Sequence, residues 1–195
     1  MAEYINVAVD AMGGDNAPTE IIKGAIEAVN VEKKVKVFLV GKQEVIEKEL
    51  AAYRCDKIGF VFQDFFLEEM YTVYQNLEIV LMISKTPDKE RKSMINKALE
   101  SVGMLHKKDS FVKVLSGGEK QRVCIARAIV NNPSIIFADE PCGNLDYENG
   151  QTVMKLLRQQ SDEGKTVILI THNLEDAKLT DHIITLKDGR IVNEN

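Results

Sequence analysis

The sequence predicts an α/β fold, in which helices flank a mostly parallel sheet and a helical subdomain is inserted. Two short apolar runs, at 5–9 and 35–40, enclose an amphipathic helical segment, a pattern typical of a βαβ unit. Further apolar runs at 58–62, 134–138 and 166–170 alternate with helical segments. These five runs are the expected core strands.

Composition narrows the class of protein. A chain of 195 residues with 45% apolar and 28% charged residues is typical of one globular domain. The net charge of −5 leaves no basic excess for general nucleic-acid binding. The odd number of cysteines, without a C-x-x-C pair, predicts free thiols in a reducing compartment. No signal peptide or membrane-spanning run is apparent, so we expect a cytoplasmic protein.

The first half of the chain contains two kinds of helical segment. After the first strand, a Gly13-Gly14 turn leads to a helix that Pro18 begins, and Asp15 or Asn16 is expected to cap it. Residues 64–115 form the predicted helical subdomain. Within this subdomain, Thr72 is the expected cap residue before an apolar-periodic segment, and 88–102 is amphipathic.

The stretch from Leu115 to Asp146 carries most of the recognisable chemistry. Ser116, Gly117, Gly118 and Glu119 form a turn that opens into a helix over 120–130. Backbone N–H groups at such a helix start, beside residues without side chains, can approach a phosphate closely.

Polar side chains follow two of the expected strands. Asp139 and Glu140 end the run 134–138, at the carboxyl edge where ligands of open α/β sheets bind. The run 166–170 ends in Thr171 and His172 in the same way. A short helix over 174–179 and a hairpin over 183–192 complete the chain.

The order of these motifs resembles one family, the ATP-binding cassette (ABC) ATPases. LSGGE-x-QR, an apolar strand ending in DEP, and then G-N-L-D are similar to its signature, Walker B motif and D-loop. The lipoprotein-release and macrolide-export branch is the most similar. The resemblance covers residues 47–195 and implies a P-loop-NTPase-like or Rossmann-like sheet.

The resemblance also implies roles for individual residues around ATP and Mg²⁺. Asp139 would hold Mg²⁺ through water, Glu140 would orient or deprotonate the attacking water, and Gln63 would sense the γ-phosphate and the metal. His172 would contact the γ-phosphate, and Asp146 would organise the interface between two chains. Nucleotide-binding residues from the signature would be Ser116, Gly117, Gly118 and Glu119.

The implied partners are ABC membrane subunits and a second ATPase chain, which includes the alternative of a homodimer. In this family ATP sits between two chains, one supplying the phosphate-binding loop and the other the signature. The helical subdomain would dock on the membrane subunits. The implied location is therefore the cytoplasm, with peripheral binding at the inner face of the cell membrane.

The phosphate-binding sequence G-x-x-x-x-G-K-[ST] does not occur. The triplet Gly164-Lys165-Thr166 precedes a strand instead of following one. By spacing from Gln63, the phosphate loop would fall at 13–20, where Asp15 and Glu20 stand. Like charges a few ångströms apart repel by about 1–4 kcal/mol. We therefore expect very poor ATP hydrolysis by this chain alone.

Residues 1–46 resemble a different family. VAVDAMGGDNAP, followed by a helix and a VFLVG strand, is similar to the N-terminus of the phosphate acyltransferases of bacterial phospholipid synthesis. Because no Pro/Gly/Ser-rich spacer marks the junction, we expect both segments to share one sheet.

Three interpretations stay open on the sequence alone. The chain is an ABC-type subunit with impaired hydrolysis whose signature acts in trans, a phosphate acyltransferase-like enzyme, or an inactive chimeric or engineered α/β protein.

Overall fold

The computed structural model describes residues 5–32, 34–188 and 190–194. Contacts divide the chain into two compact units, Met1–Arg54 and Cys55–Asn195. The division falls inside helix α2 (Gln43–Lys57). The expected α/β architecture with parallel strands and an inserted helical subdomain is confirmed.

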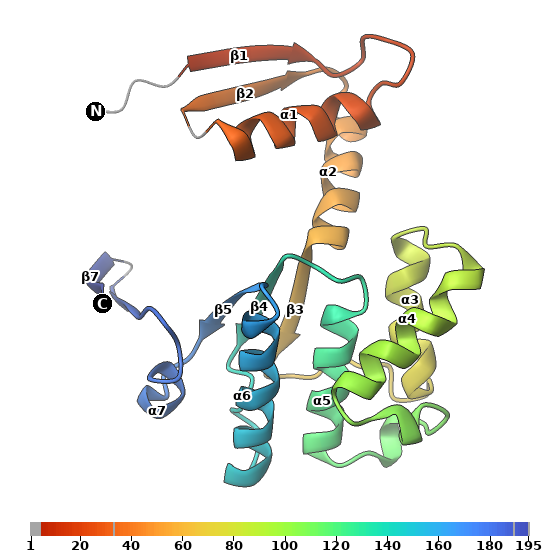
Figure 1. The fold of residues 1–195 in the computed structure, drawn as a ribbon, viewed down its shortest axis with the longest axis vertical. Coiled ribbons are helices and arrows are strands. Elements are labelled where there is room, and N and C mark those ends of the chain that lie inside the picture. Colours follow the sequence, from red (N-terminus) through yellow and green to blue (C-terminus); the bar gives the residue numbers. More distant parts are fainter. Residues whose placement is uncertain (1–4, 33, 189, 195) are drawn as a thin grey trace. The chain divides into compact units, whose positions relative to one another are not determined.

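The first unit is a small βαβ element. Strand β1 (Ile5–Asp10) pairs in parallel with β2 (Val35–Val40), in the register Ile5↔Val35. Helix α1 (Thr19–Val31) connects the two strands and packs beside them (Figure 1). Its buried side chains are Ile22 and Ala25.

The predicted cap of α1 is wrong. The helix begins at Thr19, so that Pro18 occupies the N-cap position, and no side chain donates or accepts a capping hydrogen bond. Proline has no hydrogen-bonding side chain, and Asp15 and Asn16 lie too early in the chain to reach the first turn as an N-cap does. The backbone carbonyl of Asn16 instead accepts the N–H of Glu20 at 3.3 Å.

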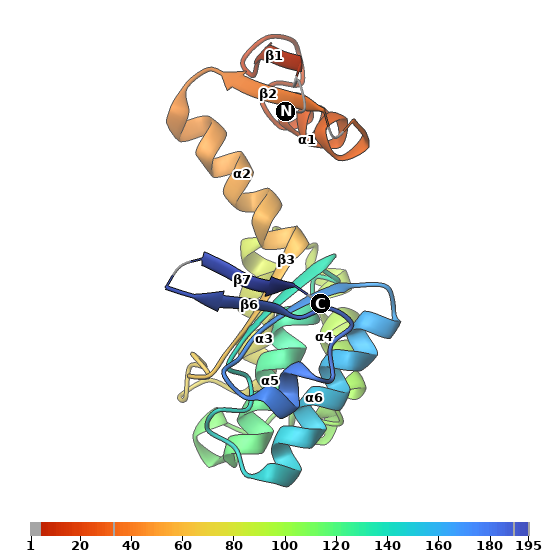
Figure 2. The same ribbon diagram turned by 90° about the vertical axis from the view of Figure 1, so that its left-hand side faces the viewer.

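The second unit is built on a three-stranded parallel sheet. Its strands are β3 (Ile58–Phe62), β4 (Ile135–Asp139) and β5 (Thr166–Ile170), in the order β3-β4-β5. Helices α5 (Gly117–Ile129) and α6 (Tyr147–Asp162) connect successive strands and lie on one face of the sheet (Figures 1 and 2).

Strand pairing is described within each unit separately, and one sheet shared by both units stays a prediction. Among the described residues, β1 and β2 pair with each other, and β3 pairs with β4 alone. Between β2 and β3 the chain forms α2, a continuous helix of 15 residues that buries none of its side chains.

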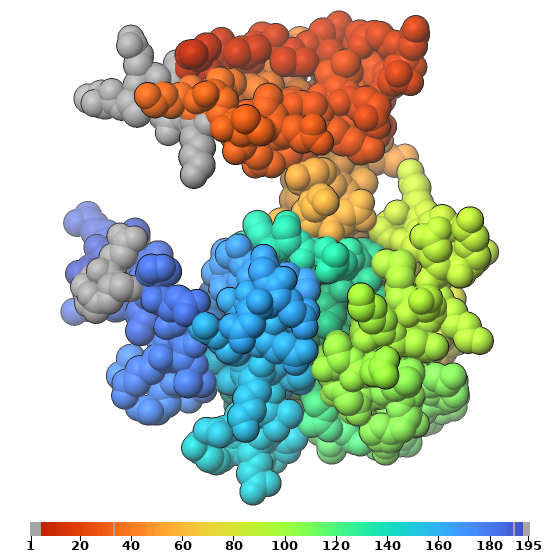
Figure 3. Space-filling model, viewed as in Figure 1, coloured from red at the N-terminus to blue at the C-terminus, as the bar shows by residue number. Residues whose placement is uncertain are grey.

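The helical subdomain lies between β3 and α5. It consists of α3 (Val73–Ile83), α4 (Asp88–Ser101) and two 3-10 turns, Leu105–Lys107 and Val112–Val114. Thr72 caps α3 as predicted, in a capping box with Gln75. On the face shown in Figure 3, α6 and the α3–α4 pair flank α5.

One hydrophobic core joins the sheet to these helices. It includes fully buried side chains from β3, α3, α4, α5, β4 and α6, namely Val61, Leu77, Ile95, Leu99, Ile125, Ile136 and Val153. The three cysteines are free thiols, as expected, and burial raises the pKa of Cys124 to about 12.

The C-terminal residues form α7 (Leu174–Ala177) and an antiparallel pair, β6 (Ile184–Lys187) and β7 (Arg190–Glu194). The predicted hairpin is confirmed, although Gly189 of its turn lies outside the described residues. Within the described ranges, no helix combines the length and apolar character needed to cross a bilayer.

Candidate functional site

The turn at 115–119, here called the signature turn, is a helix N-terminus fixed by reciprocal capping. The Ser116 hydroxyl accepts the N–H of Glu119 at 3.3 Å, and the Glu119 carboxylate accepts the N–H of Ser116 at 2.9 Å. This capping box starts α5 at Gly117, three residues before the predicted start. The hydrogen bond from the Ser116 N–H, aided by Lys107, holds the pKa of Glu119 below its ordinary value.

The residues of this turn differ in accessibility. Ser116 and Gly117 face solvent, whereas Gly118 is buried. A Cβ added at Gly118 would lie 2.0 Å from the side-chain oxygen of Asn149 on α6. Asp146 caps α6 and accepts both the backbone N–H and the side-chain N–H₂ of Asn149, at 2.9 and 2.8 Å. The start of α5 is therefore packed tightly against the start of α6.

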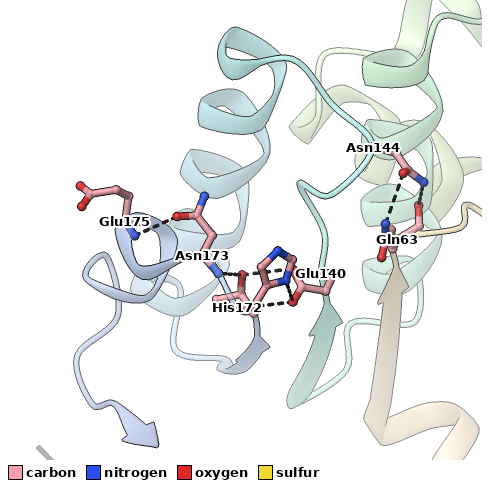
Figure 4. Close-up of polar contacts among 7 residues, drawn as sticks. Gln63, Glu140, Asn144, His172, Asn173 and Glu175 are labelled. Carbon is pink, nitrogen blue, oxygen red and sulfur yellow. Dashed lines mark hydrogen bonds and ion pairs between the residues drawn. The ribbon is translucent and has the colours of Figure 1, made fainter.

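The ends of β4 and β5 bring Glu140 and His172 together (Figure 4). The Glu140 carboxylate accepts the backbone N–H of His172 at 2.7 Å and the Thr171 hydroxyl at 3.2 Å, and it lies 2.6 Å from His172 Nδ1. Partial burial tends to raise the pKa of Glu140, but the hydrogen bonds from His172 and Thr171 together outweigh it and lower that pKa. Glu140 has a φ of 43°, an uncommon backbone conformation for this residue.

Gln63 lies at the end of β3 and is held by Asn144. Its amide donates to Asn144 Oδ1 at 3.2 Å, and Asn144 Nδ2 donates to the Gln63 carbonyl at 3.2 Å (Figure 4). A Cβ at Gly143 would approach the Gln63 amide nitrogen to 2.8 Å, so the turn after β4 passes directly beside this side chain. The amide of Gln63 is thus oriented by the residues between Glu140 and Asp146.

The strand register places the predicted metal residues side by side. Phe62 pairs with Asp139, and Asp139 pairs with Ile170, so Gln63, Asp139 and Thr171 lie at one sheet edge. Asp139 is exposed. Among the described residues, no three His, Cys, Asp or Glu side chains converge as a complete metal cage. The exposed carboxylate and amide oxygens nevertheless fit Mg²⁺, which is commonly bound by one or two carboxylates together with water and phosphate oxygens.

The loop after β1 contains a carboxylate that bonds to the loop's own backbone. Asp10 Oδ1 accepts the N–H of Met12 at 2.9 Å, and a Cβ at Gly13 would lie 2.9 Å from Asp10 Oδ2. The N–H groups of Ala17 and Glu20 donate to carbonyls within the same segment. A carboxylate thus occupies the turn, and several of its amides are already used, whereas a phosphate-binding nest presents successive N–H groups to an anion.

A cavity of about 1150 Å³ lies between α6, β5 and α7. Cys142 and Asp146 are among its lining residues, together with apolar side chains such as Met154 and Leu157 and charged ones such as Arg158. Of the candidate site residues, Asp146 lines this cavity, whereas Gln63, Ser116 and Glu140 do not.

Three residues that orient the side chains of the site could not be assigned this role from the sequence. Asn144 orients Gln63, Thr171 binds Glu140, and Asn149 joins α5 to the Asp146 cap. Of these, Asn149 had a local signal, because Asp146 and Asn149 have the spacing of an N-cap and the third helical residue. The contacts of Asn144 and Thr171 join strands that are distant in sequence.

Comparison with known proteins agrees with this geometry. The family model described as ABC transporter matches residues 24–143. That match begins inside the segment with the acyltransferase resemblance, which stays a prediction.

Individual relatives extend over most of the chain. It is 37% identical over 183 residues to an uncharacterized ABC transporter ATP-binding protein, MJ1508, of Methanocaldococcus jannaschii, covering 93% of this chain and 82% of the relative. It is 37% identical to the lipoprotein-releasing system ATP-binding protein LolD of Aquifex aeolicus, covering 98% of this chain and 85% of the relative.

Among solved structures, the ATP-binding cassette MJ0796 of Methanocaldococcus jannaschii, in a dimeric post-hydrolysis state bound to ADP and Pi, superposes with a TM-score of 0.67. That match has 30% identity and covers 100% of this chain and 85% of the other. The capped signature turn, the carboxylates at the sheet edge and these relatives agree: the chain belongs to the ATP-binding proteins of ABC transporters.

Proposed function

We propose that this chain supplies the signature side of an ATP site shared with a second cassette chain, and that its own side hydrolyses ATP very poorly. The observation that carries the proposal is the contrast between two helix starts. The signature turn is exposed, and its capping box fixes its backbone. In the turn before α1, by contrast, the Asp10 carboxylate lies against the backbone and accepts the N–H of Met12.

The signature turn has the properties of an anion-binding helix start. α5 is a helix of 13 residues, long enough to carry a macrodipole, and its first residue has no side chain. The Ser116 oxygen accepts the N–H of Glu119, which leaves its hydroxyl proton to donate to a phosphate oxygen of a partner-bound nucleotide.

The sheet edge has the groups that phosphoryl transfer requires. When bound, Mg²⁺ supplies charge neutralisation for the transferring phosphoryl group. Asp139, through water, and Gln63 would hold the ion. Glu140 would take the proton from an attacking water, and His172, bound to Glu140 through Nδ1, would present its other ring nitrogen to the γ-phosphate.

The loop after β1 explains why hydrolysis in cis should fail. Its turn contains the Asp10 carboxylate, with Asp15 and Glu20 in the same segment. No lysine is nearer in sequence than Lys23, which pairs with Glu20 at 2.9 Å. Residues 1–46 would thus replace the phosphate loop without reproducing its chemistry.

Related proteins support the proposed partners. One solved relative, the bacterial ABC transporter cassette MJ0796, is a dimer. Other relatives carry names that assign them to lipoprotein release and macrolide export. In this chain the helical subdomain exposes several large apolar side chains, Phe66, Met70, Met82, Ile83 and Phe111, which suit docking on ABC membrane subunits. We accordingly place the chain in the cytoplasm, bound peripherally at the inner membrane face.

A mixing assay tests the proposal. The second chain should be a family cassette that carries the G-x-x-x-x-G-K-[ST] loop and whose own signature serine has been replaced. We expect Mg-ATP turnover near background for either chain alone and clear turnover for the mixture. Turnover by the present chain alone that Glu140→Gln abolishes would contradict the proposal, and so would a mixture no more active than its parts.

A further inference from the structure

Gln121 of α5 is a polar side chain in a position where the core would accept an apolar one. It is fully buried, with 0% exposure. Its Nε2 donates to the carbonyl of Phe62 at 3.1 Å and to the carbonyl of Pro141 at 2.8 Å. Among the described residues its Oε1 has no hydrogen-bond partner. Because both contacts are carbonyl acceptors, the orientation of the amide is fixed.

The two carbonyls lie next to the residues of the sheet edge. Phe62 immediately precedes Gln63, and Pro141 immediately follows Glu140. A single amide group therefore ties the end of β3 to the turn after β4. That amide stands one helical turn after Gly117, on the same helix that presents the signature turn.

We propose that Gln121 is a positioning residue, which clamps the backbone beside Gln63 and Glu140 and links both to the signature helix. The functional meaning of this clamp rests on the roles proposed above for Gln63 and Glu140. The clamp itself is a property of the free chain.

Packing alone does not account for the residue at this position. An amide buried with an unsatisfied oxygen is less favourable than a methionine of nearly the same shape, which needs no hydrogen bonds. What methionine cannot provide is a pair of donors. The two donated hydrogen bonds bridge Phe62 and Pro141, which are distant in sequence, just beyond the last strand pair, Phe62 and Asp139.

The chain contains a matched control. Gln160 of α6 is also buried, at 4% exposure, and its Oε1 is likewise without a partner in the described part of the chain. Its Nε2 contacts only Glu163 of the same helix end, at 3.4 Å. Replacing it removes a buried amide without removing a bridge between segments.

Amide hydrogen exchange followed by NMR on the free chain, without nucleotide, tests the proposal. In the wild type, the side-chain N–H₂ of Gln121 should exchange slowly, because both protons are donated inside the core. In Gln121→Met, the backbone amides of Gln63, Asp64, Cys142 and Gly143 should all exchange about tenfold faster. Gln160→Met should leave these four amides unchanged. Gln121→Glu, which cannot donate two hydrogen bonds, should behave like Gln121→Met.

Several results would overturn the proposal. One is unchanged exchange at the four amides in a folded Gln121→Met variant. Another is an equal effect of Gln160→Met, which would show general destabilisation. If both Gln121 variants fail to fold, rapid exchange of the wild-type Gln121 side-chain amide would be decisive against it. Because no nucleotide is present, these results are independent of the mixing assay above.

Discussion

Replacing Gly59 by valine is expected to prevent stable folding of residues 55–195, and alanine at the same position is expected to weaken it strongly. A Cβ at Gly59 would lie 2.3 Å from the backbone carbonyl oxygen of Ala128 on α5. Backbone cannot rotate away as a side chain can, so β3 and α5 would have to separate. Overpacking of this kind typically costs about 1–3 kcal/mol, and a β-branched residue should exceed that range.

Urea unfolding monitored by circular dichroism measures this effect. Gly24→Ala is the matched control, since no atom lies within 4 Å of a Cβ at Gly24 in α1 and alanine favours a helix interior by about 1 kcal/mol. We expect Gly24→Ala to be neutral or stabilising. A Gly59→Ala protein with the wild-type unfolding midpoint would show that β3 and α5 are not packed as described.

Replacing Gly117 by aspartate is expected to abolish turnover in the mixing assay, to the level of the second chain alone. The substitution places a carboxylate at the exposed start of α5, where we propose that a partner's γ-phosphate binds. Losing such an electrostatic contact and adding a like charge should reduce turnover by at least about 10²-fold. There is room for the new Cβ, whose nearest neighbour would be a Leu145 methyl group at 3.7 Å.

Asn132→Asp is the control for charge. Asn132 lies beyond the other end of α5, and the change adds the same charge far along the helix from the signature turn. The mixture with Asn132→Asp should keep most of its turnover. Full turnover with Gly117→Asp would show that the signature turn does not face the nucleotide.

Much of the fold was predictable because its signals are local. Short apolar runs located the strands to within a residue, and the Thr72 cap was visible in the sequence. The capping box of Ser116 and Glu119 was equally visible as S-x-x-E, yet the predicted helix began three residues late. The sequence therefore contained the capping signal of Ser116 and Glu119, and only the first residue of the helix was predicted wrongly.

The sheet was less predictable because pairing is not local. A parallel βα pattern predicts strands but not their partners, so the pairs β1-β2 and β3-β4 could not be assigned from the sequence. The predicted cap from Asp15 or Asn16 failed for a different reason, because the helix start shifted by one residue past Pro18.

The candidate site also has one part that the sequence predicts and another part that it does not. The motif order singled out Gln63, Asp139, Glu140 and His172 as candidates, and the strand register brings their positions to one edge of the sheet. The groups that orient them were not, since Asn144 and Gln121 act across contacts between residues 20–81 positions apart. No periodic pattern in a single sequence reports such contacts.

Calorimetric titration of Mg-ATP into the isolated chain tests the central claim most directly, with circular dichroism to show that the chain is folded and with Gln63→Ala and His172→Ala as controls. We predict no micromolar binding by the isolated chain, and binding once the cassette carrying the phosphate loop is added. Micromolar binding by the isolated chain, weakened by either alanine variant, would mean that the loop after β1 is a working phosphate site. That result would contradict the proposal that this chain supplies the signature and a second chain supplies the phosphate-binding loop.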